Sequence, residues 1–366
     1  MVSRIEDYAI VGDMQSVALI STDGSVDWLC LPRFDSEACF AALLGTDNHG
    51  QWQIAPVRRV ATATRRYAGD TLILETGWET PEGAVRVTDF MPPRDDGQPP
   101  VLVRIVTGVR GTVDMNVTLR VRFGYGSIVP WLTQIKGGIR ASAGPDAVWL
   151  RAPVQMTGRD LAHIATFSVA EGESVPFVLT YLPSHKDEPA HLDAFQSLDQ
   201  TRRFWSGWVS RCTYDGDYRD AVVRSLITLK ALTYQPTGGI VAAGTTSLPE
   251  DIGGVRNWDY RYCWLRDATI TLEALLRTGY TEEAKAWRLW LGRAIAGHPQ
   301  DLQIMYGVAG ERRLAEWEAD WLPGYENSAP VRIGNAAAGQ LQLDVYGEVI
   351  EAIHSRPGQS QCCVTS

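Results

Sequence analysis

The spacing of apolar residues changes near the middle of the chain. Up to about residue 183, short stretches alternate apolar and polar positions with the period of two that an extended strand gives. Turn-forming residues interrupt them at Asp23-Gly24 in VALISTDGSVDWLCLP and at residues 81–83 in TLILETGWETPEGAVRVTDFMP. LVRIVTGVRGTVDMNVTLRV and HIATFSVAEGESVPFVLTYLP follow the same pattern. Residues 1–183 are therefore predicted to form an antiparallel β-sandwich.

Residues 184–216 are polar at first and aromatic afterwards, which indicates a linker and a helix that lead into the second half. From residue 217 onward the apolar residues repeat with a helical period. In DYRDAVVRSLITLKALTY, Asp217 is placed to cap the first turn of a helix. We expect the buried face of this helix to carry Tyr218, Val222, Ser225, Leu229 and Leu232.

Further helices are predicted after this one. ATITLEALLRT ends at Gly279, and Thr281 is placed to cap EEAKAWRLWLGRAIA, which has Glu282 and Glu283 in its first turn. Another helix is expected in QLQLDVYGEVIEAI. Because these helices follow one another with no strand pattern between them, residues 217–354 are predicted to be an all-α domain.

The last residues, 355–366, lose the helical period. SRPGQSQCCVTS contains the helix-breaking pair Pro357-Gly358 and two adjacent cysteines. This segment is interpreted as an aberrant tail, which is either a frayed chain end or a premature, frameshifted end.

Composition excludes several classes of function. The net charge is −9 and lysines and arginines are scattered, so no basic stripe for nucleic acid is expected. No run of about 18 apolar residues and no signal-peptide pattern is present, which predicts a cytoplasmic protein without a membrane partner. The six cysteines and six histidines show no CxxC or HExxH spacing, so neither a disulfide framework nor a metal site is expected.

The richest stretch for chemistry is GGVRNWDYRYCWLRDATITLEALL, residues 253–276. Aromatic faces cover the apolar side of a sugar ring, and charged side chains bond its hydroxyls. Such side chains gather here as Trp258, Tyr262, Trp264, Arg266 and Asp267, and we expect them to face one cleft. Equally open at this point is that the aromatic residues belong to the core and that Arg266-Asp267 is a solvated pair at a helix start.

A second stretch, residues 305–349, places polar side chains around a glycine-rich loop that opens a helix. They are Arg332, Asn335, Gln340 and Asp344. A surface loop with an ordinary Gly-Asn turn and a capped helix would give the same pattern.

Together, these stretches resemble glycoside hydrolase family 15, the glucoamylases and the trehalase-type bacterial members. IEDYAIVGDMQSVALISTDGSVDWLCLPRFDSEACFAALLG is similar to the family's N-terminal β-sandwich. TTSLPE, NWDYRYCWLRDA, MYGVAGER and PVRIGNAAAGQLQLDVYGE are similar to consecutive blocks of its catalytic domain, in the family's order. The resemblance implies a multidomain β + α fold, with a β-sandwich followed by an (α/α)6 barrel whose loops form a funnel for an α-glucoside.

The resemblance also implies roles for residues. Arg266 and Asp267 match the pair that binds glucose in the innermost subsite, and Tyr262 and Trp264 match the aromatic wall beside it. Three further residues fall in the block that lines the adjacent subsite: Arg332, Asn335 and Gln340.

The chain departs from the family in its catalytic carboxylates. An inverting glycosidase needs a carboxylic acid and a carboxylate roughly 6.5–9.5 Å apart. In the family both are glutamates of later blocks, and neither block is found here, so no catalytic residue is assigned and the barrel is expected to be incomplete. The remaining glutamates of this region are interpreted as solvated carboxylates: Glu311, Glu316, Glu318 and Glu326.

The resemblance therefore implies inverting hydrolysis of trehalose or maltooligosaccharides, without a redox cofactor. The trehalase-type branch is favoured by MYGVAGER and GYENSAPVRIGN, and it would allow a phosphate or magnesium requirement, for which the sequence shows no ligand set. The alternatives are a truncated, non-catalytic remnant with at most weak sugar binding, and an assembly role for the β-domain alone. Self-association through exposed barrel faces is expected in an incomplete barrel.

Overall fold

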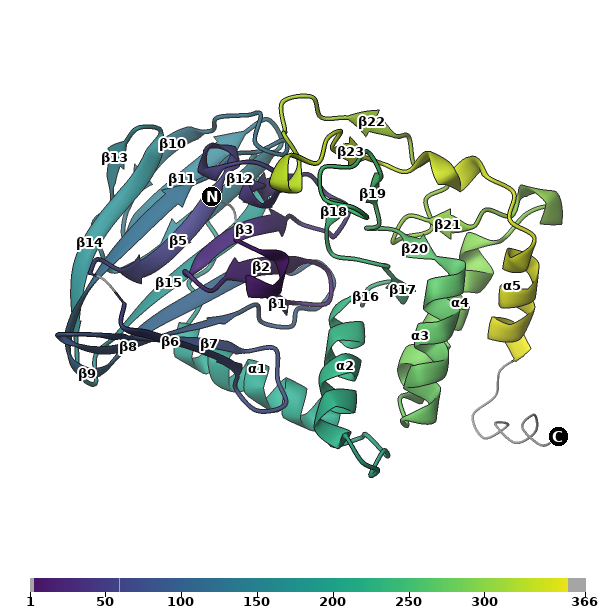
Figure 1. Cartoon of the computed structure of the whole chain (residues 1–366), viewed down its shortest axis with the longest axis horizontal. Helices are drawn as coiled ribbons and strands as arrows, with labels where there is room; N and C mark the ends of the chain where they lie inside the picture. The colour runs from purple at the N-terminus through teal and green to yellow at the C-terminus, as the bar shows by residue number, and fades with distance from the viewer. Residues whose placement is uncertain (1–2, 59, 355–366) are drawn as a thin grey trace.

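The structure is a computed structural model and describes residues 3–58 and 60–354. Its first half consists of antiparallel strands and its second half of helices and short hairpins, and the two halves lie side by side (Figure 1). The expected tail, residues 355–366, lies outside the described residues. The strands of the first half are β1 (Tyr8–Gly12), β2 (Val17–Ser21), β3 (Ser25–Cys30), β4 (Ala38–Phe40), β5 (Gln51–Pro56), β6 (Thr62–Tyr67), β7 (Leu74–Thr80), β8 (Gly83–Phe90), β9 (Val101–Arg120), β10 (Trp131–Ile135), β11 (Gly138–Ala143), β12 (Asp146–Arg151), β13 (Thr157–Arg159), β14 (Ala162–Ala170) and β15 (Ser174–Pro183).

The predicted hairpins are confirmed at the β2–β3 and β7–β8 turns, and Gly24 has the positive φ of 80° that its turn requires. LVRIVTGVRGTVDMNVTLRV, in contrast, is not interrupted but forms the single 20-residue strand β9. The pairing of β9 with β8 shifts register between Gly108 and Arg110 without ending the strand. A side chain at Gly108 is excluded by the close approach of the neighbouring backbone, since a Cβ there would lie only 2.0 Å from the Ala170 carbonyl oxygen.

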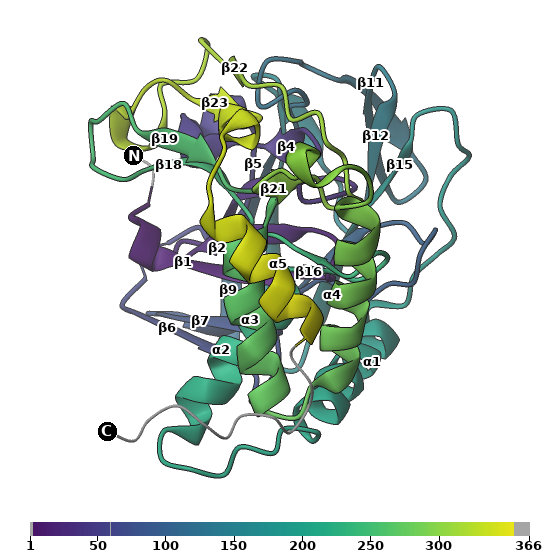
Figure 2. The same ribbon diagram turned by 90° about the vertical axis from the view of Figure 1, so that its right-hand side faces the viewer.

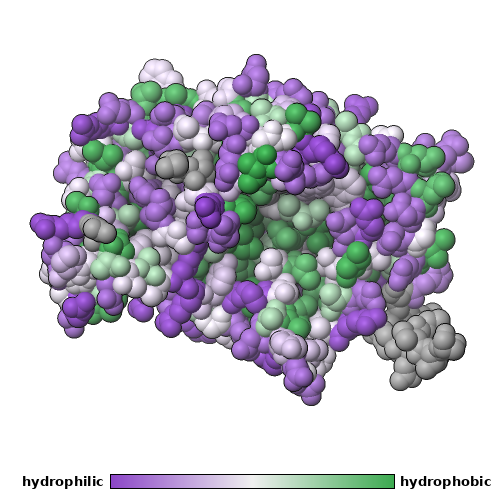
Figure 3. All heavy atoms as spheres, viewed as in Figure 1, coloured by the Kyte–Doolittle hydropathy of each residue, from purple (hydrophilic) through white to green (hydrophobic). Residues whose placement is uncertain are grey.

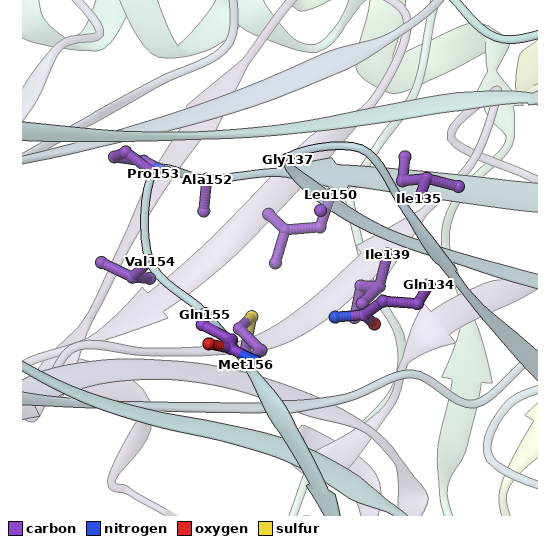
Figure 4. A pocket seen from close by; sticks show the side chains of 11 residues that line it. Gln134, Ile135, Gly137, Ile139, Leu150, Ala152, Pro153, Val154, Gln155 and Met156 are labelled. Atoms are coloured by element: carbon purple, nitrogen blue, oxygen red, sulfur yellow. The ribbon is translucent and has the colours of Figure 1, made fainter.

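Strand β9 is the centre of the sheet arrangement. Its first part pairs with β8 and β15, and its second part with β5 and β14. Apolar side chains from strands on both parts, among them Trp52, Trp78, Val117 and Phe177, form one buried cluster. A small pocket of about 270 Å³ lies at the edge of this half, between β11, β12 and the loop of residues 152–156 (Figure 4).

The helices expected from the helical period are present. They are α1 (Ala194–Val209), α2 (Arg219–Ala231), α3 (Leu265–Arg277), α4 (Thr281–Ala294) and α5 (Asp344–His354). Glu282 and Glu283 lie in the first turn of α4 as predicted, but neither expected side-chain cap exists. Residue Tyr218, in a left-handed conformation, takes the N-cap position of α2 instead of Asp217, and Tyr280 takes that of α4 instead of Thr281.

The buried face of α2 differs from the predicted one. Its buried residues are Val223, Leu226, Ile227 and Ala231. These positions follow the expected ones by about one residue, a rotation of roughly 100° around a helix of 3.6 residues per turn. The face is set by packing against Trp205 and Trp208 of α1 and Leu275 of α3, which the local pattern does not contain.

Short strands separate the helices, contrary to the expectation of a purely helical second half. They are β16 (Thr233–Tyr234), β17 (Gly239–Ile240), β18 (Thr246–Pro249), β19 (Asn257–Asp259), β20 (Cys263–Trp264), β21 (Met305–Tyr306), β22 (Trp317–Glu318) and β23 (Arg332–Ile333). They form four two-stranded pairs that hold the long loops above the helices, while α3, α4 and α5 stand side by side (Figure 2). Such strands, of two to four residues, are too short to give a clear period of two in the sequence.

The two halves share a hydrophobic core. One buried cluster contains Val17, Trp28 and Phe34 from the first half together with Trp287 and Tyr306 from the second. The Trp28 indole also donates a hydrogen bond of 2.8 Å to the Gly244 carbonyl. None of the helices in the described part of the chain has the length and apolar character that a membrane crossing requires.

Candidate functional site

The pair Arg266-Asp267 lies in the first turn of α3, because this helix begins at Leu265, three residues before the predicted ATITLEALLRT. The two side chains are about half exposed, at 50% and 48%, with 3.9 Å between Nε of Arg266 and Oδ2 of Asp267. Arg266 also donates a hydrogen bond of 3.4 Å to Asp344, in the first turn of α5. A carboxylate in the first turn of a helix is stabilised by the helix dipole, so two carboxylates and one arginine meet where two helices begin.

The aromatic residues before α3 take different places. Trp264 is partly buried with its ring 5.9 Å from that of Tyr260, and its indole N–H is buried without a partner among the described residues. Tyr262 is a core residue, 7% exposed, and burial raises the pKa of its hydroxyl. The core interpretation that the sequence left open therefore holds for Tyr262, whereas Trp264 immediately precedes the Arg266-Asp267 pair.

Trp258 and Arg332 form a second group. The Arg332 guanidinium lies 4.6 Å from the centre of the Trp258 ring and donates a hydrogen bond of 2.7 Å to the Val255 carbonyl. The same guanidinium forms ion pairs of 3.6 Å with both Glu316 and Glu318. Because the guanidinium of Arg332 already forms this hydrogen bond and these ion pairs, it is a positive charge held in place beside the Trp258 ring.

Asn335 and Gln340 lie differently from the expected subsite arrangement. Asn335 is buried, donates a hydrogen bond of 2.9 Å to the Asp259 carbonyl, and caps the short helix of residues 336–339 by accepting one of 3.0 Å from Ala337 N–H. Gln340 is exposed and accepts a hydrogen bond of 3.3 Å from Gln342. The capped-turn interpretation of this loop thus describes the surroundings of Asn335.

The ion pair of Asp259 and Arg261 was not singled out in the sequence. Both side chains are completely buried, with Arg261 Nη2 2.7 Å from Asp259 Oδ2. Burial opposes the positive charge of Arg261, but Asp259 outweighs it, so the pKa of Arg261 is raised. The signal for this pair is the Asp-x-Arg spacing in NWDYRYCWLRDA. Because arginine is seldom buried, this spacing alone does not predict that Arg261 lies in the core.

This ion pair connects the candidate site to the first half of the chain. Arg261 donates hydrogen bonds of 2.9 Å to the Ser36 carbonyl and to the Tyr125 hydroxyl. Asp259 accepts one of 3.1 Å from Gly334 N–H. The strand β19, the loop that carries Asn335 and the β half are therefore held together at one buried point.

The carboxylates around the site differ in their pKa shifts. Partial burial would raise the pKa of Glu311, but hydrogen bonding from Arg33 outweighs it and the pKa is lowered. Burial raises the pKa of Glu348 on α5, and repulsion from Glu351 and Asp344 adds to this. Glu348 was another residue that the sequence pattern did not single out, because its surroundings depend on how α5 packs against α3.

On the face of the molecule that Figure 3 shows, a hollow lies between the strands β1–β3 and the helices α2 and α3. Apolar side chains gather in this hollow. Within residues 3–58 and 60–354, no group of three or more His, Cys, Asp or Glu side chains could hold a metal ion.

A sheet-rich half followed by helices defines the class of the protein as glucoamylase-like in fold. A crystal structure of a bacterial glucoamylase complexed with acarbose superposes with a TM-score of 0.60, covering 85% of this chain and 53% of that chain at 12% identity. Residues 216–362 match Glycosyl hydrolases family 15, and residues 1–205 match the trehalase-like N-terminal domain. The chain therefore belongs to the trehalase-like N-terminal family, whose model matches more than half of it, and its helical half is similar to glycosyl hydrolases of family 15.

The similar curated proteins are trehalases. The chain is 35% identical to the trehalase of Mycolicibacterium smegmatis, over 96% of this chain and 56% of that protein. It is 34% identical to the trehalase of Mycobacterium tuberculosis, over 96% and 55%, and 34% identical to that of Thermoplasma acidophilum, over 92% and 58%. The chain thus spans little more than half the length of the relatives that it matches.

Proposed function

We propose that the chain is the sugar-binding part of an inverting α-glucoside hydrolase and that its sugar is trehalose. In this proposal residues 1–183 are the β-domain, 184–216 a linker and helix, and 217–354 the first part of an (α/α)6 barrel. The trehalases among its relatives support the choice of sugar, and the superposition with a glucoamylase supports the barrel.

The observation that carries the proposal is the group of Trp264, Arg266, Asp267 and Asp344 where α3 and α5 begin. Two carboxylates and a guanidinium offer charge-assisted hydrogen bonds to vicinal hydroxyls of a sugar. The partly buried indole of Trp264 offers an apolar ring face. These are the groups that hold and orient a pyranose, and orientation of the substrate is a large part of catalysis.

Binding without hydrolysis is the expected behaviour of this chain. A general acid must be protonated near neutral pH, which requires a raised pKa. Glu311, Glu316 and Glu318 are paired with arginines, and the pKa of Glu311 is lowered. The lowered pKa of Glu311 favours its ionised form, and Glu316 and Glu318 are held in ion pairs with Arg332, so we assign all three to structural ion pairs and not to acid catalysis.

Trehalose binding by the purified chain tests this proposal. Calorimetric titration should detect weak binding that Asp267→Ala abolishes, since the substitution removes a carboxylate that bonds the sugar. Asp199→Ala is the matched control, because Asp199 is an exposed aspartate on α1, outside the candidate site, and its substitution should leave the affinity unchanged. Equal affinity of the wild-type chain and Asp267→Ala would overturn the assignment of the site.

A further inference from the structure

Two tryptophans stand next to each other on the surface where the second half meets the first. Trp317 and Trp321 are 41% and 39% exposed, their ring centres are 5.8 Å apart, and the ring planes are inclined by 35°. Of the thirteen tryptophans in the chain, one other, Trp131 on β10, is exposed to this extent or more. Leaving two adjacent indoles in water forgoes the free energy of burying them, which is why paired exposed aromatic rings mark binding surfaces.

The two rings are held in place from below. Trp321 donates a hydrogen bond of 3.0 Å from its indole N–H to the Tyr125 carbonyl. The buried Tyr125 ring meets the Trp317 ring edge-on at 6.1 Å, and its hydroxyl accepts the hydrogen bond from Arg261. A surface that is already ordered loses little conformational entropy when a ligand binds.

The tryptophan pair lies on a different face of the β22–β23 hairpin from the group formed by Arg332 and Trp258. Trp317 is the cross-strand partner of Ile333, and Glu318 is the partner of Arg332. Successive side chains of a strand point to opposite faces, so Trp317 points away from the side on which Arg332 meets Trp258 and Glu318. A ligand on the two indoles would therefore not compete for the groups around Arg332.

We propose that Trp317 and Trp321 form a second carbohydrate-binding surface, which takes a linear α-linked glucan; the choice of an α-glucoside rests on the proposed function, and the choice of a chain of several units rests on the two adjacent rings. Each indole face covers the apolar C–H side of one glucose unit. Asp320, exposed between the two tryptophans in sequence, supplies a carboxylate that accepts hydrogen bonds from sugar hydroxyls.

Titration with maltoheptaose tests the surface, followed by calorimetry and by tryptophan fluorescence. The chain carrying Asp267→Ala is used as the background, so that sugar binding by the Arg266-Asp267 group at the start of α3 does not contribute. In this background maltoheptaose should bind, and Trp317→Ala or Trp321→Ala should each weaken binding about tenfold, the effect of losing one stacked ring of roughly 1.4 kcal/mol. Trp131→Ala, which removes an exposed tryptophan on a different strand, is the control and should leave the affinity unchanged.

Trp317→Leu keeps apolar bulk over Tyr125 while removing the aromatic face, and it should weaken binding as much as Trp317→Ala does. No maltoheptaose binding, or equal affinity of Trp321→Ala, Trp317→Leu and their Asp267→Ala parent, would overturn the inference. The proposed function fails on a different result, namely trehalose binding that does not depend on Asp267. The two failures are thus distinguishable in one set of titrations.

Discussion

At the scale of single residues, Asp259 and Arg261 connect three segments that are distant in sequence. Their side chains are fully buried, and removing one charge leaves the other without its partner. Asp259→Asn should therefore lower the free energy of unfolding by about 3–5 kcal/mol, measured by urea denaturation. Asp199→Asn, at an exposed position on α1, is the control and should change it by less than about 1 kcal/mol. Equal effects of the two substitutions would contradict this role.

A buried carboxylate on α4 makes the stability depend on pH. Burial would raise the pKa of Glu283, but Lys230, Trp208 and Arg211 outweigh burial and lower the pKa below its ordinary value of 4.5. The folded protein therefore stabilises the ionised carboxylate of Glu283. This ionised group contributes to the free energy of unfolding above pH 4.5, and the contribution is lost as the pH falls through the lowered pKa. As the pH is lowered from 4.5 through this pKa, the free energy of unfolding should fall more steeply for the wild-type chain than for Glu283→Gln. Parallel pH profiles would argue against the assignment.

The sequence predicted the residues of the candidate site better than their surroundings. NWDYRYCWLRDA indicated that Arg266 and Asp267 lie together at the start of a helix, and the structure places them there. The burial of Tyr262 and the capping role of Asn335 depend on contacts with distant segments. No local pattern records such contacts, because the same residue types occur in exposed loops.

At the scale of elements, the turn between α3 and α4 requires a glycine. Gly279 has a φ of 96°, and a Cβ there would lie 2.9 Å from Thr213 Cγ2 and 3.0 Å from the Arg211 carbonyl oxygen. Gly279→Ala should lower the free energy of unfolding by about 1–3 kcal/mol. Gly292→Ala in α4 meets open space and should raise it by up to about 1 kcal/mol, since alanine favours the helix. Denaturation curves that shift in the same direction for both variants would contradict this explanation.

Elements with a strong local period could be predicted, and those set by packing could not. The helices and the hairpins around Gly24 and residues 81–83 follow from period and turn chemistry. The 20-residue strand β9 could not be predicted, because Gly108 and Gly111 permit either a turn or an irregularity within a strand. Only the neighbouring strands β8 and β14 decide between the two.

At the scale of the whole molecule, the shared core predicts that both halves unfold together. Trp28 and Phe34 of the β half are buried against Trp287 and Tyr306 of the helical half. Thermal unfolding followed by near-ultraviolet and far-ultraviolet circular dichroism should therefore show coincident transitions. A separate transition of the helices, with the β signal retained, would show that the contacts between the halves are too weak to couple them.

We propose that these residues bind an α-glucoside but contain no working acid and base. Loss of a positioned acid or base typically lowers the rate by about 10²–10⁴-fold, so a chain without either is expected to show no measurable turnover. The most direct measurement is glucose release from trehalose by the purified chain, compared with the same chain carrying Asp267→Ala. We expect no detectable glucose from either protein. Glucose release by the wild-type chain that Asp267→Ala abolishes would contradict it, because a complete catalytic site would then lie within these residues.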